Sequence, residues 1–230
     1  MSRIILASQS PSRRSVLEQA GVEFEVQVSE VDESAVLESA SAEGPLTPAE
    51  TALLLARAKA EAVAALPASR GALVLGCDSV FELDGASYGK PYTVDVAFQR
   101  WQQMRGRTGT LHTGHWLVSA ATASTTAQHS WLGAGAMGAG PLGVPESTLA
   151  SAGETVSSQV SFAEAPDEQI LAYAQSGEAL RCAGAFTLEG RGAAFIEHVQ
   201  GDPNAVIGLS PAALNRLLGH FGASVTDFWT

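Results

Sequence analysis

Cysteine is scarce in this sequence, and the two cysteines that occur lie far apart. The 230 residues contain only Cys77 and Cys182, with no C-x-x-C pair and no histidine at metal-ligand spacing beside them. This excludes a thiolate zinc site, which needs clustered Cys or His ligands. A two-cysteine chain of this length is typical of a reduced protein, so we expect a cytoplasmic location.

Long apolar runs are also missing. The chain begins with an apolar run of four residues, 4–7, which is too short for a signal-peptide core or a membrane span. No later window is long, apolar and free of polar breaks. We therefore expect no membrane partner.

Positive charge is in short supply. The chain has 13 Lys and Arg against 24 Asp and Glu, which gives a formal net charge of -11. Nucleic acids are bound through a basic face that displaces counterions, so this composition predicts no nucleic-acid partner. A phosphate-rich ligand would have to be bound by a few basic residues gathered in one place.

The order of the predicted elements favours a single α/β domain over residues 1–230. Residues 4–7 fit a short buried strand, and Ser10-Pro11 begins a helix with a hydroxyl cap and a proline in its first turn. A capping box at Thr47 begins a longer helix over residues 48–66. Strands and helices alternate in this way along the chain, which predicts a mixed sheet.

Two segments show no such pattern. Residues 34–46 are expected to be a loop. Residues from about 122 to 158 are rich in Ala, Gly, Ser and Thr and contain no Lys or Arg, so we expect a low-complexity inserted loop or hairpin there.

The first candidate for phosphate binding is the segment from Ser8 to the start of the first helix. A helix N-terminus offers free backbone N–H groups and a positive dipole end, and here it carries serine hydroxyls and Arg13. The alternative is an ordinary capped surface helix whose arginines are solvated.

Lys59 is a second candidate because it lies in an apolar stripe of its helix, beside Leu55, Ala56 and Val63. Burying a cation is costly unless it has a partner. Lys59 therefore either reaches an anionic ligand in a cleft or extends past the rim to water. With no protein partner, a Lys59→Met variant should be as stable as the wild type or more stable.

Asp78 is the main catalytic candidate. It follows the apolar residues 73–77, which we expect to form a strand that ends at Asp78, where α/β proteins place ligands. A carboxylate there can bind a metal or accept a proton from water. An aspartyl-phosphate mechanism is excluded because its second carboxylate position is Val80. Glu33 offers another carboxylate and Lys90 another cation.

These segments together resemble the actinobacterial type of the Maf family of nucleoside triphosphate pyrophosphatases. Each match is short, but their order and spacing run along nearly the whole chain. The matching segments are Leu6-Ala7-Ser8-Gln9-Ser10-Pro11-Ser12-Arg13, Val31-Asp32-Glu33, Ala58-Lys59-Ala60, Gly76-Cys77-Asp78-Ser79-Val80, Gly89-Lys90-Pro91, Gly106-Arg107-Thr108 with Thr113-Gly114, Tyr173 with Ser176-Gly177-Glu178, Ala183-Gly184-Ala185-Phe186 with Glu189-Gly190, and Val206-Ile207-Gly208-Leu209.

The resemblance implies a two-lobed fold, like that of inosine triphosphatases, around an elongated mixed sheet with a central cleft. It implies that water attacks the α-phosphorus of a nucleoside triphosphate and releases pyrophosphate, with Mg²⁺ or Mn²⁺ as cofactor. The residues it assigns are catalytic Asp78, substrate-binding Ser8, Arg13, Lys59, Lys90 and Glu189, and metal-binding Glu33 and Asp78.

The sequence departs from the family pattern at two of these places. Ser12 replaces the first of two paired arginines, so phosphate binding falls on Arg13. Glu189 stands where the branch acting on dTTP and UTP has Gln, and Cys182-Ala183-Gly184 is similar to the branch acting on 7-methyl-GTP, CTP and UTP. The preferred base stays open, as does a homodimeric state.

Two alternative functions also stay open. One is a hydrolase that removes deaminated purine triphosphates from the nucleotide pool. The other is a non-enzymatic regulator of septum formation, with a link to cell-division arrest. The presence of Asp78, Lys59 and Lys90 favours an enzyme, since a purely structural protein has no need of all three.

Overall fold

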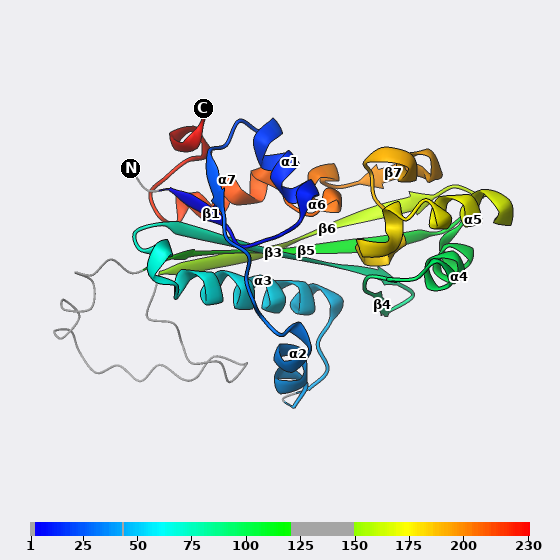
Figure 1. Ribbon diagram of the computed structural model, residues 1–230, viewed down its shortest axis with the longest axis horizontal. Coiled ribbons are helices and arrows are strands. Elements are labelled where there is room, and N and C mark those ends of the chain that lie inside the picture. The colour runs from blue at the N-terminus through cyan, green and yellow to red at the C-terminus, as the bar shows by residue number, and fades with distance from the viewer. Residues whose placement is uncertain (1–2, 43, 121–149) are drawn as a thin grey trace.

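The computed structural model describes residues 3–42, 44–120 and 150–230, which build an elongated mixed sheet with helices on both faces (Figure 1). Its strands lie in the order β2-β1-β3-β5-β6-β7, and β4 pairs with β3. The strands are β1 (Ile4–Leu6), β2 (Phe24–Val26), β3 (Leu73–Leu83), β4 (Ala86–Tyr88), β5 (Thr108–Ser119), β6 (Ser151–Phe162) and β7 (Ile196–Gln200).

Parallel and antiparallel pairing both occur. The short strand β1 runs parallel to β2 and β3, while β3, β5, β6 and β7 pair antiparallel in turn. The long strands β3, β5 and β6 form the body of the sheet. The predicted α/β class with a mixed sheet is confirmed.

Strand β3 does not end at Asp78, as the apolar pattern had suggested. It continues to Leu83 because its pairing with β5 is unbroken from Leu73↔Ser119 to Glu82↔Thr110. On its other edge, β1 pairs only with residues 73–75 and β4 only with residues 81–83. Asp78 therefore lies mid-strand, in a stretch of β3 that neither β1 nor β4 covers.

Helices cover the two faces of the sheet differently (Figure 1). One face is covered by α3 (Pro48–Ala64), whereas α1 (Pro11–Gln19), α6 (Pro203–Ile207) and α7 (Pro211–Gly219) lie on the opposite face. The far end of the sheet carries α4 (Val94–Met104) and α5 (Asp167–Gln175).

Two hydrophobic clusters on the face away from α3 make the molecule two-lobed. Leu75 and Cys77 belong to the cluster under α1 and α7, and Phe81 and Leu83 to the cluster with α4 and α5. Ser79 separates them, since side chains of a strand alternate between faces. Cys77 is fully buried, and this burial raises the pKa of its thiol to about 12.

The expected loop over residues 34–46 is wrong for most of its length, because α2 spans Glu33–Ser41. Asp32 caps this helix: its Oδ1 accepts the N–H of Ala35 at 3.1 Å. Only Ala40 is buried among the residues of α2, so the helix adds little to the core.

The expected inserted loop over residues 122–158 is wrong at its end. Strand β6 begins at Ser151 and pairs with β5 along its length. A Cβ on Gly153 would lie 2.1 Å from the ring of Trp116. Packing against this ring therefore requires glycine within the strand, so the small residue is not the sign of a loop. The remainder of the expected loop lies almost entirely outside the described residues.

Both cysteines are free. Among the residues that the structure describes, no helix combines the length and the apolar character needed to cross a membrane.

Helix α3 packs directly on the backbone of the sheet. A Cβ on Gly76 would lie 2.1 Å from the carbonyl oxygen of Ala56, and one on Gly114 would lie 2.4 Å from that of Ala52. The helix presents fully buried alanines at these contacts. Because the contacts are backbone to backbone, a side chain cannot be accommodated by a rotamer change.

We predict that Gly76→Ala lowers the free energy of unfolding by about 1–3 kcal/mol, since the added methyl group must push α3 away from β3. Thermal melting measures this. The matched control is Gly219→Ala at the end of α7, where nothing lies within 4 Å of a new Cβ, and which should be neutral or slightly stabilising. Equal melting midpoints for Gly76→Ala and the wild type would contradict the close packing.

Candidate active site

A cavity of about 600 Å³ lies where β3 is uncovered, between the two lobes. It brings together six of the seven predicted site residues from five separate parts of the chain. These are Ser8, Arg13, Glu33, Lys59, Asp78 and Lys90.

The N-terminus of α1 forms one wall of the cavity. Ser10 caps the helix by accepting the N–H of Arg13 at 3.4 Å, and Pro11 is its first residue. Ser8 is almost fully buried, and its Oγ accepts the N–H of Ser10 at 3.2 Å. The loop after β1 is thus folded back so that its hydroxyls and the helix N-terminus face the same space.

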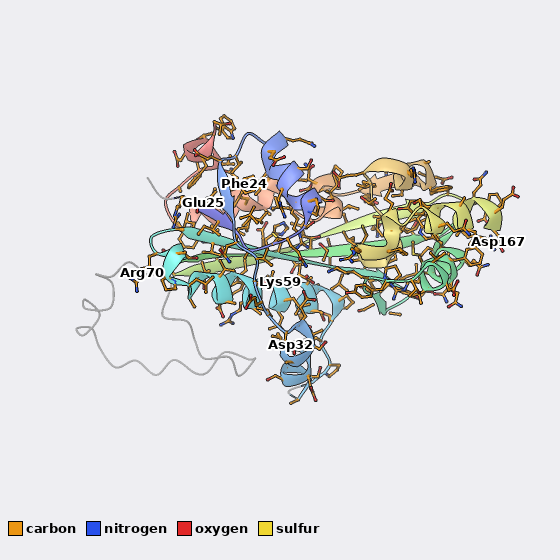
Figure 2. All side chains as sticks on the ribbon, in the orientation of Figure 1. Phe24, Glu25, Asp32, Lys59, Arg70 and Asp167 are labelled. Atoms are coloured by element: carbon orange, nitrogen blue, oxygen red, sulfur yellow. The ribbon has the colours of Figure 1, made fainter. Side chains whose placement is uncertain are left out.

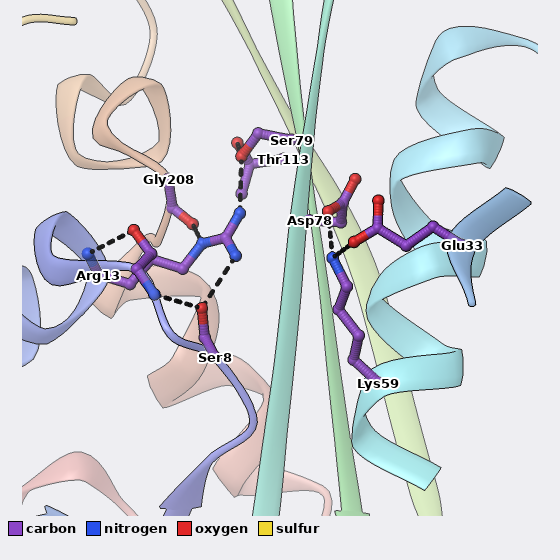
Figure 3. A network of polar contacts seen from close by, with 9 residues as sticks. Ser8, Arg13, Glu33, Lys59, Asp78, Ser79, Thr113 and Gly208 are labelled. Atoms are coloured by element: carbon purple, nitrogen blue, oxygen red, sulfur yellow. Dashed lines mark hydrogen bonds and ion pairs between the residues drawn. The ribbon is translucent and has the colours of Figure 1, made fainter. Parts of the chain in front are cut away.

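Arg13 is held by three partners and is not a solvated surface residue (Figure 3). Its Nε donates to the Gly208 carbonyl at 2.8 Å, Nη1 to Ser8 Oγ at 3.2 Å and Nη2 to Ser79 Oγ at 3.3 Å. Gly208 has a φ of +129°, and a Cβ there would be 3.2 Å from Arg13 Nε. The guanidinium is therefore fixed in one orientation on the cavity wall.

Thr113 extends this network and was not predicted as a site residue. Its Oγ1 donates to the Ala205 carbonyl at 2.7 Å and lies 3.0 Å from Ser79 Oγ. Since the Thr113 proton is used on Ala205, Ser79 donates to Thr113 and keeps its lone pairs for Arg13. The Thr113-Gly114 pair in the family pattern was the available signal for this residue.

Lys59 and Asp78 lie on the other side of β3, facing α3 (Figure 3). Lys59 projects from the middle of α3 at the centre of the molecule (Figure 2), and its Nζ lies 2.6 Å from Asp78 Oδ1 and 2.7 Å from Glu33 Oε1. The side chains of Lys59 and Asp78 are only 11% and 13% exposed. Lys59 thus has two protein partners, so the premise of the expectation for Lys59→Met, that this lysine has no protein partner, is wrong.

Glu33 enters the site as the first residue of α2, the helix that the sequence did not predict. Partial burial alone would raise the pKa of this carboxyl. The hydrogen bond and charge of Lys59, with smaller contributions from Lys90 and Arg13, outweigh it and hold the pKa of Glu33 below its ordinary value of 4.5. Glu33 is therefore charged at neutral pH.

Two further cations come from the lobe of α4. Lys90 is exposed and lines the cavity from the segment after β4, and Arg181 lines it from the 3-10 helix η3 (Glu178–Arg181). Arg181 was not predicted, although it directly precedes the segment Cys182-Ala183-Gly184 that matches the family pattern. Together with Arg13 and Lys59, these two cations make four that line one cavity, in a chain whose net charge is -11.

Glu189 is the predicted residue that the structure does not bring to the cavity. From the same stretch of chain, Cys182 and Thr187 line it instead. Glu178 fixes the backbone after Glu189, because its carboxylate accepts the N–H groups of Arg191 at 3.0 Å and Gly192 at 2.8 Å.

The histidines of β5 lie outside the cavity lining. His112 bonds Ser157 Oγ and Glu82 Oε2, both at 2.8 Å. Burial, with the charge of Arg13, lowers the pKa of His115 to about 4, so its neutral ring can accept the Ser210 N–H at 2.8 Å. Both side chains support the fold.

Glu33 and Asp78 are chemically suited to a hard divalent cation, since Mg²⁺ and Mn²⁺ prefer carboxylate oxygens. Among the described residues, no group of three or more His, Cys, Asp or Glu side chains is placed to hold a metal. This donor set fits an ion bound by one or two carboxylates together with substrate phosphates, rather than one caged by protein alone.

With this geometry in place, the comparisons with known proteins are decisive for the family. The profile described as "Maf-like protein" matches residues 3–221. The chain belongs to the Maf family.

Relatives across this Maf family match over nearly their full length. Proteins named "Nucleoside triphosphate pyrophosphatase" from Streptomyces avermitilis and Streptomyces coelicolor are 46% and 45% identical, covering 99% of this chain and 95% and 94% of the relatives. One of the same name from Corynebacterium diphtheriae is 42% identical, covering 98% of both chains.

A solved structure titled "Structure of a HAM1 protein from Coxiella burnetii" aligns with 99% of this chain and 96% of its own. Its identity of 16% and TM-score of 0.38 are too low to support an inference about this Maf protein.

We predict that Lys59→Met destabilises the protein at pH 7 by about 1–3 kcal/mol, because it leaves Asp78 and Glu33 facing each other without a cation. The value lies below the ~3–5 kcal/mol of fully buried pairs because the Glu33 side chain is 44% exposed. Urea unfolding of both proteins measures it.

The destabilisation by Lys59→Met should depend on pH in a definite direction. A carboxyl whose pKa is lowered by folding adds stability above its unfolded pKa and loses it as the pH falls through the folded pKa. The difference in the free energy of unfolding between the wild type and Lys59→Met should therefore be largest at pH 7 and become smaller below about pH 4.5. Arg57→Met on the same helix is the control, since its pair with Glu61 is worth at most about 1 kcal/mol. Equal stabilities at pH 7 would contradict the assigned pairing.

Proposed function

We propose that this Maf protein hydrolyses nucleoside triphosphates to nucleoside monophosphates and pyrophosphate. The observation that carries the proposal is the shared cavity. Asp78, paired with Lys59, lines it together with Arg13, Lys90 and Arg181. The names of the full-length relatives agree with it.

The triphosphate would be bound at the wall formed by α1. The N-terminus of α1 offers backbone N–H groups and a positive dipole end, and Arg13 presents a guanidinium whose orientation Gly208 and Ser8 fix. Arg and Lys neutralise phosphate charge through charge-assisted hydrogen bonds. Local positive charge explains how a chain of net charge -11 can attract a polyanion.

Asp78 would act as the general base. It accepts a proton from water while the water oxygen bonds to the α-phosphorus and the bond from that phosphorus to the bridging oxygen breaks, so that pyrophosphate leaves with the electron pair. Lys59 orients Asp78 through their 2.6 Å contact. Fixed charges aimed at the developing negative charge provide the main stabilisation in phosphoryl transfer.

We also propose a divalent cation, Mg²⁺ or Mn²⁺, held by Glu33 and Asp78 together with phosphate oxygens. Such an ion would neutralise phosphate charge and polarise the phosphoryl group. Support for it comes from the two carboxylates that meet at Lys59 Nζ.

The preferred base is a matter for a substrate panel. Glu189 stays a prediction as a base-binding residue. Initial rates with UTP, CTP, dTTP, 7-methyl-GTP and ITP would rank the bases and test the alternative of a hydrolase for deaminated purines. A role in clearing surplus or non-standard nucleotides rests on the family resemblance. A cytoplasmic location is supported by the free thiols of Cys77 and Cys182.

We predict that Asp78→Asn lowers kcat by at least about 100-fold, or roughly 2.7 kcal/mol, as expected for loss of a general base. Nucleotide binding should persist, because Arg13, Lys90 and Arg181 remain; a non-hydrolysable triphosphate should still raise the melting midpoint. Asp84→Asn, in the turn that ends β3 and outside the cavity, is the matched control and should keep full activity. Turnover of Asp78→Asn within about threefold of wild type would remove Asp78 from the mechanism.

A further inference from the structure

One large side chain at the cavity has no role in the mechanism above. Tyr92 lines the cavity and is 68% exposed, more than any other large hydrophobic residue among those described. The exposed Trp229 and Leu171 do not line it. An aromatic ring left in water at the rim of a binding cavity is available to a ligand.

The backbone holds Tyr92 in a conformation that tyrosine rarely adopts. Its φ is +60°, in the left-handed region that favours glycine and asparagine. The Tyr92 N–H donates to the Leu180 carbonyl at 3.0 Å, and Thr93, the next residue, caps α4. Strained backbone of this kind persists where the surrounding structure fixes it, often at ligand sites.

The position of Tyr92 points to one part of the nucleotide. Its backbone is tied to the segment whose next residues, Arg181 and Cys182, also line the cavity on the lobe of α4. The phosphate-binding wall proposed above, the N-terminus of α1 with Ser8 and Arg13, belongs to the opposite lobe. The cations Lys90 and Arg181 line the cavity on the same lobe as Tyr92. A nucleotide whose phosphates lie at Arg13 would therefore extend its nucleoside toward Tyr92.

We infer that Tyr92 is a stacking platform for the nucleobase of the substrate. This inference rests on the proposed function and adds the residue that binds the base. Every base has a π-face, so stacking on an aromatic ring contributes affinity with little choice between bases. Tyr92 would thus give affinity for nucleosides in general, leaving selectivity to groups that can contact base edges.

The test uses Tyr92→Asn, which removes the ring while tolerating the left-handed backbone. Steady-state kinetics with UTP and GTP would be compared with the inhibition constant of inorganic tripolyphosphate, a competitor that has no base. We expect KM for both nucleotides to rise about tenfold, kcat to stay within twofold, and the tripolyphosphate constant to stay unchanged. Tyr92→Phe should restore the wild-type KM, and Trp229→Ala should match the wild type throughout.

Two results would overturn the inference. One is an unchanged KM in Tyr92→Asn. The other is an inhibition constant of tripolyphosphate that rises as much as the nucleotide KM, which would place the ring against the phosphates.

A binding experiment separates this inference from the proposed function. If the wild type hydrolyses no nucleotide, the proposed function fails, and stacking is then tested by melting: UTP should raise the melting midpoint of the wild type more than that of Tyr92→Asn, with equal shifts from tripolyphosphate. Equal shifts from UTP would refute stacking.

Discussion

The contact between the backbone of α3 and the backbone of the sheet sets the geometry of the rest of the site. Gly76 and Gly114 leave no side chain between α3 and β3 or β5, so the helix lies close enough for Lys59 to place its ammonium 2.6 Å from Asp78. Glu33, the first residue of α2, contacts the same ammonium, with its Oε1 2.7 Å from Lys59 Nζ. A helix held further away would leave both carboxylates without their cation.

Strand β3 separates two networks with different tasks. On one side Arg13, fixed by Gly208 and Ser79, presents a cation whose hydrogen bonds hold it still. On the other side Lys59 holds two carboxylates, those of Glu33 and Asp78, together in a partly buried setting. The cavity reaches both networks because β1 ends and β4 begins on either side of Asp78. A gap in strand pairing, rather than the end of a strand, thus brings the helix N-terminus with Arg13 and a carboxylate pair to one cavity.

The sequence predicted those parts of the site whose signal is local. Lys59 was identified because it interrupts the apolar stripe of its own helix, and the α1 wall because its cap and proline are adjacent in sequence. The unbroken run of β3 through Asp78 could not be predicted, since it depends on hydrogen bonds to β5. Helix α2 was missed because it is short and its apolar residues are only weakly gathered on one face. The start of β6 was missed because small residues such as Gly153, which packs against Trp116, are also typical of a loop.

The central claim is that water attacks the α-phosphorus of a nucleoside triphosphate bound in the cavity. Hydrolysis in ¹⁸O-labelled water, followed by mass spectrometry of the products, tests it most directly. The account predicts that the monophosphate carries one ¹⁸O atom and the pyrophosphate none. Label in the pyrophosphate would show attack at the β-phosphorus, and a nucleoside diphosphate as the main product would show cleavage at the γ-phosphate; either result would contradict the account.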